Sequence, residues 1–325
     1  PPFFSLMVML LAEHQGMQAA LPYLSSMERE YEFWMQGSDS VNEVGDAIKK
    51  VVMVGPDKVL NRYWDASDKP RSESYSEDLE LAENVPEAER PMLFQNLRSA
   101  CESGWDFSSR WLTDPNDLGS IITTEIIPVD LNSLLYSIEA SIATLYSEKG
   151  ESETSKLYQQ KAEIRKNAIL EFCWSEEHKY FMDYHFPSQK PTNVISAAGV
   201  YPLYFELASM DQALETAHTL EAKLLFPGGI VSTSNNSGQQ WDYPNGWAPQ
   251  QWMAIEGLKL YDQHEIADEI SNRWLQINEK VFQSSGKMME KYNVVDLNVE
   301  NGGGEYPTQD GFGWTNGVAI TLLKK

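Results

Sequence analysis

Helical periodicity that recurs in pairs constrains the fold of this chain more than any other feature. Residues 3–18 and 21–36 form the first pair, and residues 130–149 and 152–173 form the most strongly periodic one. Further segments of helical length lie at residues 74–84, 87–102, 197–209, 211–225, 249–262, 266–282 and 317–323. Consecutive helices joined by short loops pack antiparallel. The pattern therefore predicts an all-α protein built from helix hairpins.

Four connections between these helices are long and rich in Gly, Pro, Asn, Trp and acidic residues. They span residues 103–128, 226–249, 286–296 and 301–316. A regular helical core with one set of dense polar and aromatic connections is typical of an α/α barrel with a loop-built site.

One small β-hairpin is expected beside the helices, because residues 51–54 and 59–63 flank the turn-forming Gly55-Pro56-Asp57. A break in composition or a Pro/Ser-rich linker is not seen along the chain. We interpret residues 1–325 as a single domain.

The charge balance excludes two classes of partner. Acidic residues number 48 and basic residues 25, for a net charge of -23, which repels nucleic acid and anionic lipid. The longest apolar run, Phe3 to Ala12, is too short to span a membrane. Cys101 and Cys173 allow at most one disulfide, and two free buried thiols are the favoured interpretation. Five scattered histidines and no close cysteine pair give no reason to expect a metal site.

An acidic residue stands among aromatic side chains in the segment ESGWDFSSRW, residues 102–111. Rings around Asp106 would desolvate its carboxyl and favour the protonated form, as a general acid requires. An Asp in this place is also typical of an N-cap on a following helix. The segment alone leaves both interpretations open.

A second aromatic segment, QWDYPNGWAP, occupies residues 240–249. Its Pro and Gly fix a sharp loop, and Trp241 and Trp247 could stack on a pyranose ring while the polar groups bind hydroxyls. As a bare pattern, a purely structural loop is the commoner explanation of this composition.

Two further acids follow in the last long connections. Glu305 comes after three glycines without the Lys of a phosphate-binding loop, so this backbone is expected to pass close to a ligand. Glu290 stands beside Lys291, which is also typical of an exposed charge pair. Composition does not decide between a site and a surface.

In order and spacing, these segments resemble the motifs of the trehalase family. QWDYPNGWAP matches the second signature of that family at every position, and EKYNV at 290–294 and GGGEYPTQDGFGWTNGV at 302–318 match further motifs. The likeness extends from PPFF at 1–4 through LNRYWD at 60–65 to the last helix. It implies a trehalase of the bacterial type with a six-hairpin α/α toroid fold. The implied activity is inverting hydrolysis of α,α-trehalose to two glucose molecules.

The resemblance also implies roles for individual residues. Asp106 falls on the general acid and Glu290 on the general base of a closed pocket that holds two sugar rings. The implied substrate-binding residues are Arg71, Glu73, Gly104, Glu305, Trp105, Trp241, Trp247 and Trp314. In the Arg-Pro-Glu triplet of the family, Ser72 replaces the Pro while both charged members remain. Neither a metal nor a cofactor enters the implied chemistry.

One departure concerns the start of the sequence. Trehalases carry an earlier signature ahead of the Pro-Pro-Phe-Phe with which this sequence begins. We therefore expect the toroid to be incomplete on its N-terminal side. Bacterial members work in the periplasm or the cytoplasm, with the periplasm favoured here, and a monomer is expected.

Two alternatives remain at this stage. A glucoamylase-like α/α-barrel enzyme would have an open groove that admits longer α-glucans, and its substrates would extend beyond trehalose. A sugar-binding remnant would be protected against melting by sugar without releasing glucose. The presence of every acid that the mechanism requires favours the enzyme.

Overall fold

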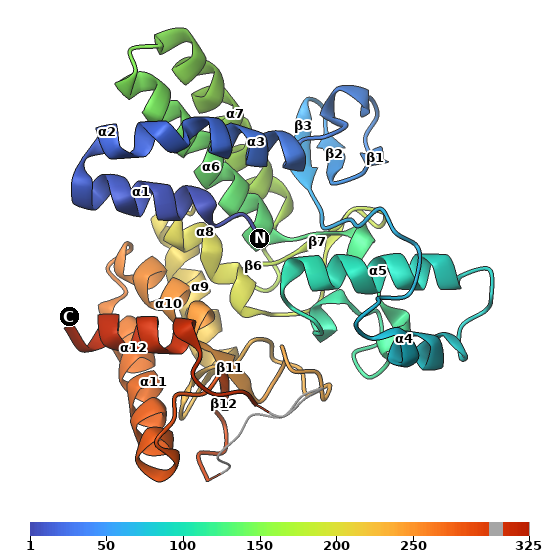
Figure 1. The fold of residues 1–325 in the computed structure, drawn as a ribbon, viewed down its shortest axis with the longest axis vertical. Helices are drawn as coiled ribbons and strands as arrows, with labels where there is room; N and C mark the ends of the chain where they lie inside the picture. Colours follow the sequence, from blue (N-terminus) through green and yellow to red (C-terminus); the bar gives the residue numbers. More distant parts are fainter. Residues whose placement is uncertain (299–307, 325) are drawn as a thin grey trace.

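The computed structural model describes residues 1–298 and 308–324, and helices dominate it (Figure 1). The α-helices are α1 (Phe4–Gln15), α2 (Met17–Ala20), α3 (Leu24–Trp34), α4 (Tyr75–Ala82), α5 (Arg90–Ser103), α6 (Val129–Glu148), α7 (Ser152–Phe172), α8 (Tyr201–Tyr204), α9 (Met210–Lys223), α10 (Ala248–Lys259), α11 (His264–Ser285) and α12 (Gly313–Lys324). Except for the segment 197–209, the predicted helices are confirmed, with boundaries shifted by a few residues.

The helices form two layers. An inner row runs α1, α6, α8, α10, α12, each helix contacting the next. Outer helices back this row, with α7 packed on α6 and α11 on α10 (Figure 1). This arrangement of inner and outer helices is an α/α toroid, as the sequence predicts.

Helix α6 shows why the pattern folds in this way. Its apolar stripe is fully buried, and the residues are Leu134, Leu135, Ile138, Ile142 and Leu145. Helix α7 adds a buried ion pair, in which Arg165 Nε lies 3.0 Å from both carboxylate oxygens of Glu139. The chain leaves α6 through Gly150, whose φ of 80° is left-handed and suits glycine. Asp130 lies in the first turn of α6, and Pro128 occupies the N-cap position.

The predicted hairpin is confirmed and has a third strand. Strands β1 (Ala47–Ile48), β2 (Val51–Gly55) and β3 (Lys58–Asn61) form an antiparallel sheet in that order. Asn61 and Asn132 fasten the sheet to α6, because the Asn61 N–H donates to Asn132 Oδ1 at 2.8 Å and Asn132 Nδ2 donates to the Asn61 carbonyl at 2.8 Å. The remaining strands are β4 (Ile126–Ile127), β5 (Trp174–Ser175), β6 (Tyr180–Phe181), β7 (Tyr184–His185), β8 (Lys190–Pro191), β9 (Leu225–Phe226), β10 (Gly229–Ile230), β11 (Asn245–Trp247) and β12 (Lys291–Asn293).

The segment 197–209 differs most from its predicted form. It contains a 3-10 turn, η6 (Ala197–Val200), and the single helical turn α8. A side chain at Gly199 would place its Cβ 2.4 Å from the Phe181 carbonyl oxygen, so this glycine lets η6 pack against β6. Glu206 then adopts a left-handed φ of 54°, and the helix does not continue.

Two smaller expectations can be compared with the structure. Both cysteines are free, with Cys173 buried and Cys101 half-buried. Among the described helices, none is long and apolar enough to cross a membrane. The assignment of a single domain stays a prediction.

Candidate active site

The beginnings of the inner helices meet at a cavity of about 360 Å³. Asp130 of α6, Tyr201 of α8, Gln250 of α10 and Trp314 of α12 all line it, and each lies in the first turn of its helix. Four of the predicted site residues are among the lining, namely Gly104, Trp105, Trp241 and Trp314. The toroid therefore gathers its connections and helix N-termini around one pocket.

The wall of the cavity begins where α5 ends. Gly104 follows the helix with a left-handed φ of 79°, which accounts for glycine there. A Cβ at this position would meet no atom within 4 Å, so the space above the backbone is open among the described residues. This geometry agrees with a close approach of a ligand to Gly104.

Three tryptophan rings stack on one another in this wall. Trp105 and Trp241 have centroids 5.4 Å apart, and Trp241 lies parallel to Trp247 at 3.7 Å. Trp247 is only 1% exposed and lies under Trp241, and the rings of Trp247 and Trp314 form a T-shaped pair with centroids 5.9 Å apart. Trp247 thus supports the wall from beneath.

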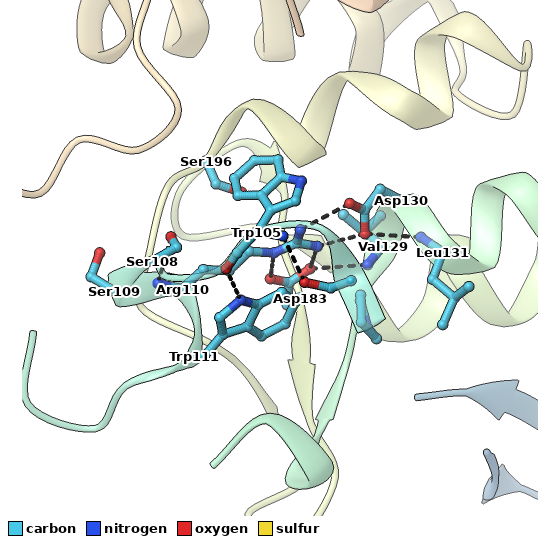
Figure 2. Close-up of polar contacts among 12 residues, drawn as sticks. Trp105, Ser108, Ser109, Arg110, Trp111, Val129, Asp130, Leu131, Asp183 and Ser196 are labelled. Carbon is cyan, nitrogen blue, oxygen red and sulfur yellow. Dashed lines mark hydrogen bonds and ion pairs between the residues drawn. The ribbon is translucent and has the colours of Figure 1, made fainter. Parts of the chain in front are cut away.

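Arg110 holds this wall in place (Figure 2). Its guanidinium lies 4.7 Å from the Trp105 ring and 4.5 Å from the Trp111 ring. It donates to both carboxylate oxygens of Asp130, at 2.8 and 2.6 Å, and to Asp183 Oδ1 at 2.8 Å. Asp183 also accepts the Val129 N–H at 3.0 Å. One buried arginine therefore orients Trp105 and the Asp130 carboxylate of the cavity lining.

The segment of residues 240–249 is fastened to the loop that carries Asp106. Asp242 is fully buried and accepts hydrogen bonds from Ser108 Oγ at 2.8 Å, the Ser109 N–H at 2.7 Å and Thr233 Oγ1 at 2.6 Å. The Trp241 N–H donates to the Phe107 carbonyl at 3.0 Å. Burial raises the pKa of Asp242 from its ordinary value, and the hydrogen bonds to its carboxylate oppose that shift.

The other side of the same segment pairs with the strand that follows Glu290. Strands β11 and β12 are antiparallel, with Trp247 opposite Lys291. Glu290 is 3% exposed, and its carbonyl accepts the Trp314 Nε1–H at 3.0 Å. An exposed charge at Glu290 is therefore the wrong interpretation. Residues 240–249 join the Asp106 loop to the Glu290 strand.

Asp106 itself is half-buried beside the cavity wall. The short helix η3 (Ser109–Trp111) that follows is capped by Ser108, whose side chain accepts the Arg110 N–H at 3.1 Å. The alternative role of Asp106 as an N-cap is thus taken by Ser108. The Asp106 carbonyl accepts a short hydrogen bond from Gln240 Nε2.

Of the remaining predicted residues, Arg71 and Glu73 belong to the described part of the chain. Arg71 is buried, donates to Asp78 through Nη2 at 2.7 Å and lies 4.9 Å from the Phe107 ring, next to Asp106. It lines a separate hollow with Asp78 and Phe107. Glu73 is exposed. Glu305 falls outside the described residues, so convergence of the full predicted set stays a prediction.

Several site residues were not predicted from the sequence. Asp130, Tyr201 and Gln250 line the cavity, and Arg110 and Asp242 hold its walls. A signal existed for Asp130, because this carboxylate stands one helical turn before Leu134, at the start of the buried apolar stripe of α6. Such a group costs free energy unless it is paired, and it indicates a partner or a site.

Replacing Asp242 with Asn should destabilise the fold and lower activity together. The amide would turn an N–H group toward Ser108, Ser109 or Thr233, which already donate, and so leave buried donors unsatisfied at about 1–3 kcal/mol. Thermal melting should show a lower Tm. Asp268→Asn, at a side chain 67% exposed, is the matched control. An unchanged Tm for Asp242→Asn would show that the hydrogen bonds of the Asp242 carboxylate contribute nothing to stability.

Among the described residues, no group of three or more His, Cys, Asp or Glu side chains is placed to hold a metal ion. A helical toroid with a tryptophan-walled cavity and acids from several loops defines the class of α/α-toroid glycoside hydrolases. Comparison with known proteins narrows this class. A family model described as Trehalase matches residues 1–325, and the chain belongs to the trehalase family.

Two curated relatives carry the name periplasmic trehalase. The protein from Citrobacter koseri is 44% identical over 323 residues, which cover 99% of this chain and 56% of the relative. The protein from Escherichia coli is 44% identical over 323 residues, covering 99% of this chain and 57% of the relative. The chain thus spans little more than half the length of these relatives.

Solved structures support the same fold. The neutral trehalase of Saccharomyces cerevisiae is 26% identical with a TM-score of 0.76, covering 100% of this chain and 62% of that one. A GH63 mannosylglycerate hydrolase from Thermus thermophilus is 16% identical with a TM-score of 0.62, covering 100% of this chain and 74% of that one. At that lower identity the similarity concerns the fold alone.

Proposed function

We propose that this protein hydrolyses α,α-trehalose to two glucose molecules with inversion, Asp106 serving as general acid and Glu290 as general base. Membership of the trehalase family supports the substrate. One observation carries the assignment of the acids. Residues 240–249 hold the Asp106 loop on one side and the Glu290 strand on the other, beside a single tryptophan-walled cavity.

The surroundings of the two carboxyls suit different tasks. Half-buried Asp106 can protonate the oxygen that bridges the two sugars and regain its proton from solvent. Glu290, only 3% exposed, can accept a proton from one water that attacks the opposite face of the sugar. Inversion requires the two carboxyl groups about 6.5–9.5 Å apart, with that water between them. The transition state resembles an oxocarbenium ion.

The cavity supplies surfaces for binding the sugar. Trp105, Trp241 and Trp314 offer apolar ring faces and edges, while Asp130 and Gln250 present polar groups to hydroxyls. Arg71, Glu73 and Glu305 complete the proposed contacts. We further propose a periplasmic monomer, the compartment being that named for the curated relatives.

Time-resolved proton NMR of the products tests this function. Inversion at one anomeric carbon should release α- and β-glucose in equal amounts before mutarotation, because the water attacks opposite the bond that breaks. Trehalose should be hydrolysed and α-1,4-linked glucans should not. Initial release of α-glucose alone would indicate retention. Turnover of longer glucans would instead favour a glucoamylase-like enzyme.

A further inference from the structure

Lys291 is a charged residue in the interior of the molecule. Its side chain is 0% exposed, and its Nζ lies 3.2 Å from Glu290 Oε2 and 3.0 Å from Gln240 Oε1. The same nitrogen lies 5.0 Å from the centre of the Trp247 ring. Lysines are almost never fully buried without partners. Its partners therefore indicate what this charge does.

Gln240 extends the contacts of Lys291 to the opposite loop. Its side-chain oxygen accepts from Lys291, and its side-chain nitrogen donates to the Asp106 carbonyl. The Gln240 carbonyl is itself fixed by hydrogen bonds from Asn245 Nδ2 at 3.0 Å and Trp247 Nε1 at 3.2 Å. A continuous bridge thus runs from the Asp106 backbone through Gln240 and Lys291 to the Glu290 carboxylate.

Two charges that act on Lys291 belong to the proposed catalytic residues. Burial lowers the pKa of Lys291 from its ordinary value, and the negative charges of Glu290 and Asp106 oppose this shift. Glu290 faces it from the adjoining position in the chain and Asp106 from the loop after α5, while Gln240 and Trp247 are neutral neighbours. The ammonium group lies where both carboxylates can compensate its burial.

We propose that Lys291 is a positioning residue for hydrolysis, orienting Glu290 and fixing its distance from the Asp106 loop through Gln240. This inference rests on the proposed roles of Asp106 and Glu290. An inverting enzyme needs a gap of fixed width for one water. A misplacement of about 1 Å costs about 10²-fold in rate, so a rigid bridge across the gap has a direct catalytic consequence.

Lys291→Met tests the proposal in the active enzyme. The methionine keeps the length and loses the charge, so kcat for trehalose should fall about 10²-fold with a much smaller change in KM. The pH–activity profile should move to higher pH by about one unit, because loss of a nearby positive charge favours protonated carboxyls. Lys291→Arg retains the charge and should keep the wild-type profile. Lys179→Met, at an exposed lysine paired with Glu176, is the control and should change neither quantity.

A second variant separates the bridge from the charge. Gln240→Leu removes the link to Asp106 and retains Lys291, so kcat should fall without the shift in pH. If Lys291→Met does not fold, Lys291→Gln removes the same charge and retains an N–H donor. An unchanged kcat and pH profile in a folded, uncharged variant would overturn the inference. Wild-type activity of Glu290→Gln would instead overturn the proposed function, so the two failures are distinguishable.

Discussion

Glu290→Gln should lower trehalose hydrolysis by about 10²–10⁴-fold, the amount that general base catalysis contributes. Glutamine retains the shape of glutamate and cannot accept a proton from water. The side-chain oxygen of glutamine can still accept from Lys291 Nζ, and the backbone at this position is held by Trp314, so the substitution should leave the pocket intact. Trehalose should still bind with nearly unchanged affinity in calorimetry.

A matched substitution separates this effect from a general loss of charge. Glu177 is exposed, and Glu177→Gln should hydrolyse trehalose at the wild-type rate. Full activity of Glu290→Gln would remove Glu290 from the mechanism. Loss of binding together with turnover would assign it to substrate recognition.

Asp106→Asn should reduce trehalose hydrolysis by a comparable factor, about 10²–10⁴-fold, through loss of the proton donor. The leaving sugar departs as a poor alkoxide unless its oxygen is protonated. A glucosyl fluoride needs much less proton assistance, so the variant should hydrolyse it with a far smaller loss. Steady-state rates on both substrates measure this difference.

The exposed residue Asp268 again provides the control. Asp268→Asn should leave both rates at their wild-type values. An equal loss on trehalose and on the fluoride in Asp106→Asn would show that Asp106 is not the proton donor.

Much of the fold follows from local periodicity. The apolar face of α6 and the turn of the β2–β3 hairpin are determined by residues that lie close together in the sequence. Both elements were therefore predicted. The short α8 was not, because Glu206 ends it in a left-handed conformation and η6 depends on packing against β6. The left-handed backbone at Glu206 and the packing of η6 on β6 depend on the folded surroundings, which the segment 197–209 alone does not reveal.

In the site, too, the features set by local sequence could be predicted and those set by contacts between distant segments could not. Stacking on a sugar is one of the two interpretations of residues 240–249 from the sequence, and Trp241 does line the cavity. Their second role, joining the Asp106 loop through Asp242 to the Glu290 strand through β11, depends on contacts between distant segments. The burial of Lys291 likewise depends on contacts between distant segments. The sequence alone is compatible with one half of an exposed charge pair, and only tertiary packing buries the ammonium group of Lys291 against Glu290 and Gln240.

The central claim is tested most directly by the hydrolysis rates of Asp106→Asn and Glu290→Gln, each measured on trehalose and on a glucosyl fluoride. Both variants should be severely impaired on trehalose. The fluoride should restore Asp106→Asn substantially and Glu290→Gln hardly at all, because water must still be activated when the leaving group needs no proton. Restoration of Glu290→Gln with none for Asp106→Asn would reverse the two roles, and wild-type rates in both variants would contradict the proposed catalytic pair.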